Sequence, residues 1–193
     1  MIRFGPGGNS DSFYEEGHKT TLDVPRWLHD RDLNAYEYQC TRGVRITQAF
    51  ANALRVQAER FQIALSIHAP YYINLASSDP AIMESSKKHI IKSLQAAKWM
   101  GADRVVMHPG SVSKMQRSEA MKNALIRLEK IVTEIDPELL DQCCLCPETM
   151  GKANNLGTLP EILELCKIHP RIRPTVDFGH IHWIHIRFGQ PEG

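Results

Sequence analysis

The sequence predicts an α/β fold in which parallel strands and helices alternate, as in a (β/α) barrel. Two observations support this prediction. Short apolar runs, such as 63–67 and 104–107, alternate with longer segments of helical periodicity, and such an alternation implies a parallel sheet with right-handed crossovers. Several of these runs also end in a side chain that can bind a metal. That placement is typical of the carboxyl-terminal edge of a parallel barrel.

Six strands are expected, each recognised as a short apolar or alternating run. They are residues 2–4, 35–40, 63–67, 104–107, 143–146 and 173–176. Five helices are expected between them, at 23–28, 46–61, 83–100, 118–135 and 159–167. Gly101 ends the third helix and Pro170 follows the fifth, as is common for these residue types. A closed barrel has eight strands and typically about 250 residues. We therefore expect an incomplete TIM-barrel-type sheet of about six strands.

The composition is that of an ordinary globular chain. It has 193 residues, 42% of them hydrophobic and 23% charged, with a formal net charge of +1. Without a large positive charge, any nucleic-acid binding must depend on a local basic surface. We find no signal peptide and no apolar run of roughly 18 residues, so we expect a cytoplasmic protein with no membrane association.

Three of the five cysteines, Cys143, Cys144 and Cys146, lie together in one expected strand. Alternate side chains of a strand face opposite ways, so these thiols cannot all converge on one metal ion. An odd number of cysteines also fits reduced thiols better than a disulfide framework. We expect these cysteines to pack in the core.

Four successive strand ends carry candidate metal ligands. His68 and His108 follow the third and fourth expected strands, Glu148 follows the fifth, and Asp177 and His180 follow the sixth. A lone histidine or carboxylate in such a place is more often a hydrogen-bonded or capping residue, but four strand ends in order favour a metal site. Imidazoles bind ions such as zinc, and a carboxylate can span two ions. Paired ions of this kind suit phosphodiester hydrolysis.

Four ordered motifs give the chain a resemblance to a known family. They are His68-x-x-Tyr71-Tyr72-Ile73-Asn74-Leu75, His108-Pro109-Gly110-Ser111, Glu148-Thr149 followed by Asn155-Leu156-Gly157, and Asp177-Phe178-Gly179-His180. With these motifs, residues 1–182 resemble the endonuclease IV family of metal-dependent apurinic/apyrimidinic endonucleases, within the xylose isomerase-like barrel superfamily. The resemblance implies a barrel that holds up to three zinc ions. It also implies hydrolysis of the phosphodiester on the 5′ side of an abasic site in double-stranded DNA.

The resemblance also implies a role for each ligand. His68 and His108 would bind one zinc ion, and Glu148 would bridge this ion to a second one. Asp177 would bind the second ion and His180 the third. Glu148 is thereby the expected catalytic residue.

Two tyrosines and two arginines are the expected DNA-binding residues. In the family, side chains at the place of Tyr71 and Tyr72 enter the DNA stack beside the abasic nucleotide, and packing over the barrel mouth is an equally good account of both. Arg42 and Arg45 follow the second strand and are candidates for phosphate contacts. Lys114 and Arg117, after the fourth strand, are further candidates, although solvated surface charge is the commoner role. We expect a monomer.

After His180 the sequence departs from the family pattern. The resemblance predicts another helix and two strands with more ligands, whereas residues 183–193 form a divergent tail. We therefore expect a C-terminally truncated barrel with fewer zinc ions and weak or no activity. Two alternatives stay open: a single-metal sugar isomerase or epimerase of the same superfamily, and an inactive barrel fragment that binds DNA or a partner. Histidines on the third and fourth strands favour the nuclease, because the isomerase sites rely mainly on carboxylates.

Overall fold

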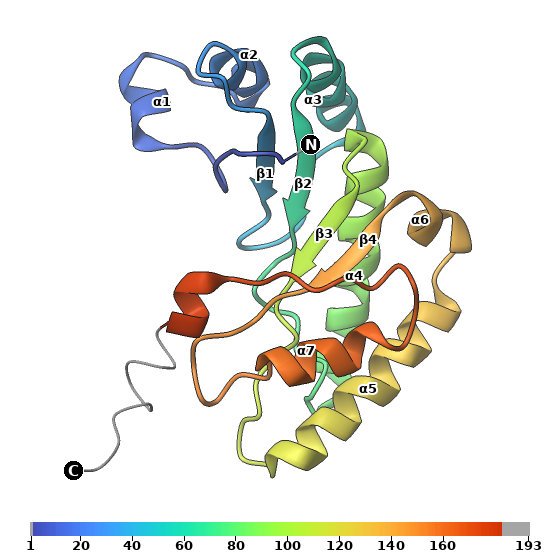
Figure 1. The fold of residues 1–193 in the computed structure, drawn as a ribbon. Helices are drawn as coiled ribbons and strands as arrows, with labels where there is room; N and C mark the ends of the chain where they lie inside the picture. The colour runs from blue at the N-terminus through green and yellow to red at the C-terminus, as the bar shows by residue number, and fades with distance from the viewer. Residues whose placement is uncertain (1, 183–193) are drawn as a thin grey trace, which may run out of the picture.

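A parallel sheet forms the centre of the structure, a computed structural model that describes residues 2–182. The expected tail at 183–193 lies outside the described residues. The sheet has four strands in sequential order, namely β1 (Ala35–Gln39), β2 (Ala64–His68), β3 (Arg104–Met107) and β4 (Cys144–Pro147). All three strand pairs are parallel, and the sheet is open (Figure 1). The predicted fold class, an incomplete TIM-barrel-type sheet, is confirmed.

Helices connect the strands in the expected alternation. The longer ones are α3 (Gln48–Arg60), α4 (Pro80–Met100), α5 (Arg117–Glu134) and α7 (Leu159–Cys166). The shorter ones are α1 (Asp11–Glu15), α2 (Val24–His29) and α6 (Pro137–Gln142), with a 3₁₀ helix at Thr21–Asp23. The sequence interpretation missed α1, α6 and the 3₁₀ helix, because such short helices have too few turns to show a periodic pattern.

Capping residues explain where α4 begins and ends. Asp79 precedes the helix and its side chain accepts a hydrogen bond from the backbone N–H of Ala81, while Pro80 occupies the first turn. Gly101 ends the helix in the left-handed conformation, with φ at +67°. The helix therefore starts three residues before the predicted start at 83, because the Asp-Pro start signal outweighs the weak apolar pattern of its first turn.

The last predicted strand and a segment that begins at the end of the first one take part in the sheet only through isolated bridges. Residues 4–8 run beside β1, where the N–H groups of Ala35 and Glu37 donate to Phe4 and Pro6 at 3.0 and 3.1 Å. Residues 171–175 run beside β4 through two further parallel bridges. Two prolines each remove a backbone donor that a regular ladder would use: Pro6 lies in the first edge segment, and Pro147 lies in β4 opposite Arg173. The structure therefore has four strands rather than six, with a strand-like segment along each edge.

The two faces of the sheet differ in character. One face lies under the helices and carries apolar residues that belong to the main core, namely Tyr36, Leu65, Ile67, Val105, Met107 and Leu145. On the other face, the register places His68 beside Val106 and Val106 beside Cys146. Because side chains alternate between the faces, His108 and Glu148 continue this second row just beyond β3 and β4.

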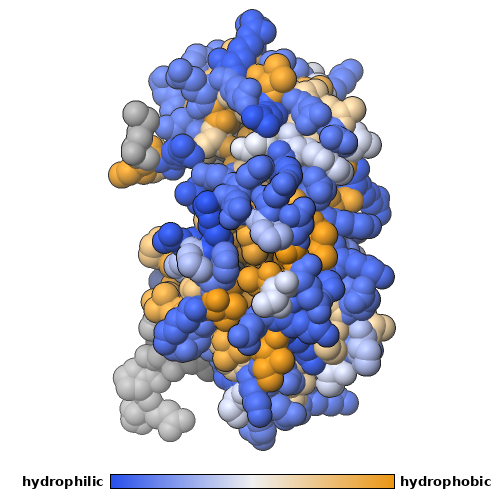
Figure 2. Space-filling view, turned by 90° about the vertical axis from the view of Figure 1, so that its right-hand side faces the viewer, coloured by the Kyte–Doolittle hydropathy of each residue, from blue (hydrophilic) through white to orange (hydrophobic). Residues whose placement is uncertain are grey.

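The helix-covered side of the molecule is largely hydrophilic, with small apolar areas among polar side chains (Figure 2). This is the usual outer surface of amphipathic helices. Within the described residues, we find no helix that combines the length and the apolar character needed to cross a membrane.

The five cysteines are free thiols, as expected. Cys143 and Cys146 are buried, and burial raises the pKa of the Cys146 thiol to about 12. Neither of the candidate metal groups in residues 2–182 contains a cysteine.

Candidate metal centre

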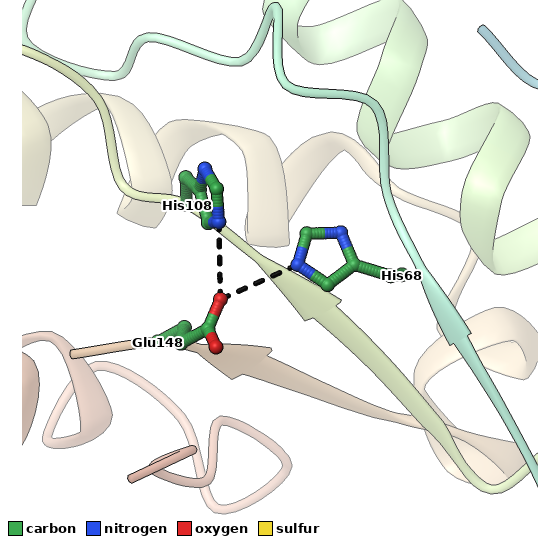
Figure 3. A group of neighbouring side chains, drawn as sticks. All are labelled: His68, His108 and Glu148. Carbon is green, nitrogen blue, oxygen red and sulfur yellow. Dashed lines mark hydrogen bonds and ion pairs between the residues drawn. The ribbon is translucent and has the colours of Figure 1, made fainter. Parts of the chain in front are cut away.

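Three side chains from adjacent strands converge at the carboxyl-terminal edge of the sheet. His68 is the last residue of β2, while His108 and Glu148 directly follow β3 and β4. The Nε2 atoms of His68 and His108 lie 3.3 and 3.1 Å from the same carboxylate oxygen, Oε2 of Glu148. Figure 3 shows both imidazoles pointing at this carboxylate. The parallel register brings together residues that are 80 positions apart in the chain.

A second group shares Glu148 with the first. It adds Asp177 and His180, and in each group the candidate ligand atoms lie within 4.8 Å of one another. Thr149 places this group: its hydroxyl accepts from the backbone N–H of Asp177 at 2.8 Å, and its carbonyl lies 2.9 Å from Nδ1 of His180. All five predicted ligands thus meet at one edge. Their roles as ligands stay a prediction.

The hydrogen bonds of His68 fit a metal ligand. Its Nδ1 lies 2.8 Å from the carbonyl oxygen of Ala69, so this nitrogen carries a proton and donates it. In the neutral ring, Nε2 then turns a lone pair toward the carboxylate of Glu148. Two acceptors facing each other need a cation between them, and a metal ion or a second imidazole proton meets that need. Two imidazoles and a carboxylate are a ligand set that zinc accepts.

The ionisation of Glu148 and His68 follows from their burial and their hydrogen bonds. Burial alone would raise the pKa of Glu148, but hydrogen bonds from His108 and His68 outweigh burial and lower it to about 2. Burial alone would lower the pKa of His68, but its hydrogen bonds to Glu148 and to the carbonyl of Ala69 outweigh burial and raise it. The carboxylate is therefore ionised throughout the neutral range and ready to face a cation.

A cavity of about 540 Å³ opens beside the two groups. It is lined by His108, His180, Tyr71, Met150, Gly151, Lys152, Asn155 and Gly179. Its volume lies within the roughly 300–1,000 Å³ that is usual for ligand pockets. The cavity gives a substrate access to the edge where the five candidate ligands meet.

The predicted DNA-binding residues lie near this edge and stay exposed. The ring of Tyr71 lies over the histidine pair, with centroids 5.6 Å from His68 and 5.3 Å from His108. Tyr72 instead lies 6.0 Å from the ring of His89 on α4. Both tyrosines remain more than half exposed, at 53% and 56%, so neither packs in the hydrophobic core.

The loop after β1 carries the predicted arginines next to Tyr71. Arg42 and Arg45 are exposed, and within residues 2–182 we find no carboxylate paired with either. The carbonyl of Thr41 accepts a hydrogen bond from the N–H of Tyr71 at 3.5 Å. The two cations therefore share the edge that carries the metal groups, and phosphate binding by them stays a prediction.

The guanidinium of Arg117 is engaged in an ion pair and hydrogen bonds within the fold, so it is not a free cation. Its Nε and Nη2 lie 2.6 and 2.7 Å from the two carboxylate oxygens of Glu161. It also donates to the carbonyls of Ala153 and Asn155, at 2.8 and 3.0 Å. The sequence analysis named Arg117 as a candidate for phosphate contacts, and this expectation is corrected: its guanidinium holds two loops together. The partner lies 44 positions away, so no local pattern could reveal the pair. Lys114 is exposed, as expected.

Asn74 and Gly110 position the loop that follows His108, a role that the sequence motifs did not reveal. The side-chain oxygen of Asn74 accepts from the N–H groups of Ser111 and Ala76, each at 3.1 Å. A Cβ atom on Gly110 would lie 2.3 Å from that oxygen, and the φ of Gly110 is +129°. Only glycine fits this close approach. The pair thereby joins the loops that follow β2 and β3.

The pairing of Glu161 with Arg117 predicts a pH-dependent effect on stability. Burial alone would raise the pKa of Glu161, but hydrogen bonds from Arg117 and from two backbone N–H groups outweigh burial and lower it. A group with a lowered pKa stabilises the fold above its unfolded value and loses this effect as the pH falls. Replacing Glu161 with glutamine should therefore lower the free energy of unfolding by about 1–2 kcal/mol at pH 7.

The difference in unfolding free energy between Glu161→Gln and the unmodified chain should shrink as the pH falls from the ordinary pKa of a glutamate toward the lowered pKa of Glu161 in the fold. Urea unfolding at pH 7 and at pH 3.5 measures it. Glu129→Gln, an exposed carboxylate on the same helix as Arg117, is the control and should have little effect. An equal loss at both pH values would show that charge is not the cause.

Comparisons with known proteins agree with the fold. A sequence profile of the family described as xylose isomerase-like TIM barrel matches residues 25–191. An uncharacterised protein of Methanocaldococcus jannaschii is 31% identical over 182 residues, which cover 94% of this chain and 63% of that protein. A probable endonuclease 4 of Mycoplasma genitalium is 30% identical over 134 residues, which cover 67% of this chain and 44% of that protein. The chain therefore spans less than two thirds of the length of either relative.

Two solved structures illustrate the structural likeness. Endonuclease IV from Thermus thermophilus matches with a TM-score of 0.62 and 20% identity, covering 90% of this chain and 69% of that one. A D-psicose 3-epimerase matches with a TM-score of 0.71 and 15% identity, covering 85% of this chain and 60% of that one. At these identities the likeness is one of fold.

Proposed function

Because the chain belongs to the xylose isomerase-like TIM barrel family, we propose that it is a metal-dependent endonuclease that hydrolyses the phosphodiester 5′ to an abasic site in DNA. The observation that carries this proposal is the sharing of Glu148 between two groups of candidate ligands. One carboxylate between two ligand sets suits a pair of neighbouring ions, and such pairs suit phosphodiester hydrolysis.

The residues present fit zinc. His68, His108 and Glu148 would hold one ion, with Glu148 and Asp177 holding a second and His180 close by for a further one. When bound, the ions would neutralise the charge that develops on the attacking and leaving oxygens. Glu148 is the proposed catalytic residue, because its ionised carboxylate lies between the two ligand sets.

Other residues support DNA as the substrate. Tyr71 lies over the histidine pair and is exposed, so its flat ring can stack on a base or fill the gap beside a missing one. Tyr72 is exposed beside it. Arg42 and Arg45 provide positive charge on the same edge for backbone phosphates. The relatives named probable endonuclease 4 add weight to this proposal.

A substrate comparison tests the proposal. The zinc-loaded chain is incubated with a duplex that contains one abasic site, with the intact duplex, and with a panel of ketoses and aldoses. We expect incision 5′ to the abasic site alone, at the weak rate expected of this chain, with loss of incision in a chelator and recovery when zinc is returned. Epimerisation of a sugar without incision would favour the sugar-enzyme alternative. Tight binding of the abasic duplex without incision would favour a binding function.

A further inference from the structure

The wall of the cavity beside the metal groups carries an unpaired lysine. Lys152 lines this cavity together with His108 and His180, and it is exposed. Within residues 2–182, Lys87, Lys98 and others pair with carboxylates, whereas we find no such partner for Lys152. Its positive charge is therefore available to a ligand in the cavity.

The backbone on either side of Lys152 is held in place. The carbonyls of the three residues that follow it accept hydrogen bonds from the segment after β3: Arg117 donates to residues 153 and 155, and the N–H of Val112 donates to Asn154 at 2.7 Å. On its other side, a Cβ atom on Gly151 would lie only 3.0 Å from Cα of His180. These contacts fix the backbone at Lys152 relative to the candidate metal groups.

We propose that Lys152 binds a DNA phosphate that neighbours the reacting phosphodiester, and so positions the strand over the metal groups. This inference rests on the proposed function. A DNA strand carries one phosphate per roughly 3.4 Å of helix axis, so a strand with one phosphodiester at the metals presents another nearby. Lysine binds phosphate as a point charge on a flexible stem. Asn155 lines the same cavity and can add an amide donor.

The first test replaces Lys152 with glutamine in the zinc-loaded full chain. We expect kcat/KM for the abasic duplex to fall about three- to tenfold at low salt, mainly through KM. The slope of log kcat/KM against log salt should become shallower by about 0.9, because one phosphate contact is lost. Zinc content should not change, and Lys152→Arg should restore most of the activity. Lys122→Gln, an exposed lysine on α5 outside the cavity, is the matched control and should behave like the unmodified chain.

The second test identifies the phosphate. Single phosphates near the abasic site are replaced in turn by a neutral methylphosphonate. At the phosphate that Lys152 contacts, Lys152→Gln should have no further effect, whereas it should keep its effect at the other positions. An unchanged salt slope, an effect that is equal at every position, or loss of zinc from Lys152→Gln would each overturn the inference while incision by the unmodified chain still supports the proposed function. An unmodified chain that does not incise would overturn both.

Discussion

Replacing Glu148 with glutamine is expected to lower kcat for incision of an abasic-site duplex by about 10²- to 10³-fold, the loss typical when one key stabilising group is removed from an active site. The amide of glutamine has no negative charge and a poorer ability to span two ions. Steady-state incision assays at saturating zinc measure this effect. Thermal unfolding checks that the fold is retained.

The matched control for this variant is Glu164→Gln, which changes an exposed carboxylate on α7 that pairs with Lys167 away from the cavity. It should leave kcat unchanged. If Glu148→Gln kept nearly full kcat with zinc bound, Glu148 would not be the catalytic residue.

Replacing His108 with alanine is expected to weaken zinc binding by more than about 100-fold. Three protein ligands are the usual number for a catalytic zinc site, and even partners outside the ligand set commonly change affinity by about 10- to 100-fold. Competition with a chromophoric chelator measures the affinity, and elemental analysis of the purified protein gives the zinc content.

His29→Ala is the control for the loss of a histidine, because His29 is exposed and lies against Phe61, far along the chain from every candidate ligand. Its zinc affinity should equal that of the unmodified chain. Stoichiometric zinc with unchanged affinity in His108→Ala would contradict the assignment of the first ligand group.

The sequence predicts the convergence of His68, His108 and Glu148 because two simple rules generate it. Strands that run parallel deliver their ends to one edge, and the alternation of side chains decides which face each residue joins. These rules need only the positions of β2, β3 and β4. Those positions are visible as short apolar runs.

The parts that the sequence did not predict depend on contacts between distant residues. Arg117 looks like a surface cation until Glu161 is found against it. Asn74 holds Ser111 from 37 positions away, through a geometry that no periodic pattern encodes. The edge segments are further cases, since Pro6 and Pro147 interrupt the ladders that apolar composition alone would suggest. Local patterns place the ligands, whereas tertiary contacts decide how the surrounding loops are held.

If the second group binds a metal ion, its attachment through Thr149 couples metal occupancy thermodynamically to the docking of the chain. His68 and Glu148 lie at the ends of regular strands and their side chains are about one-tenth exposed. Asp177 and His180 are more than one-third exposed, and their hydrogen bonds to the segment after β4 run through one threonine, Thr149. An ion held by the second group would bind only the docked arrangement of residues 175–180, so its binding free energy would stabilise that docking. Metal binding by the first group would therefore need no ordering of the chain, whereas metal binding by the second would also need residues 175–180 to be ordered.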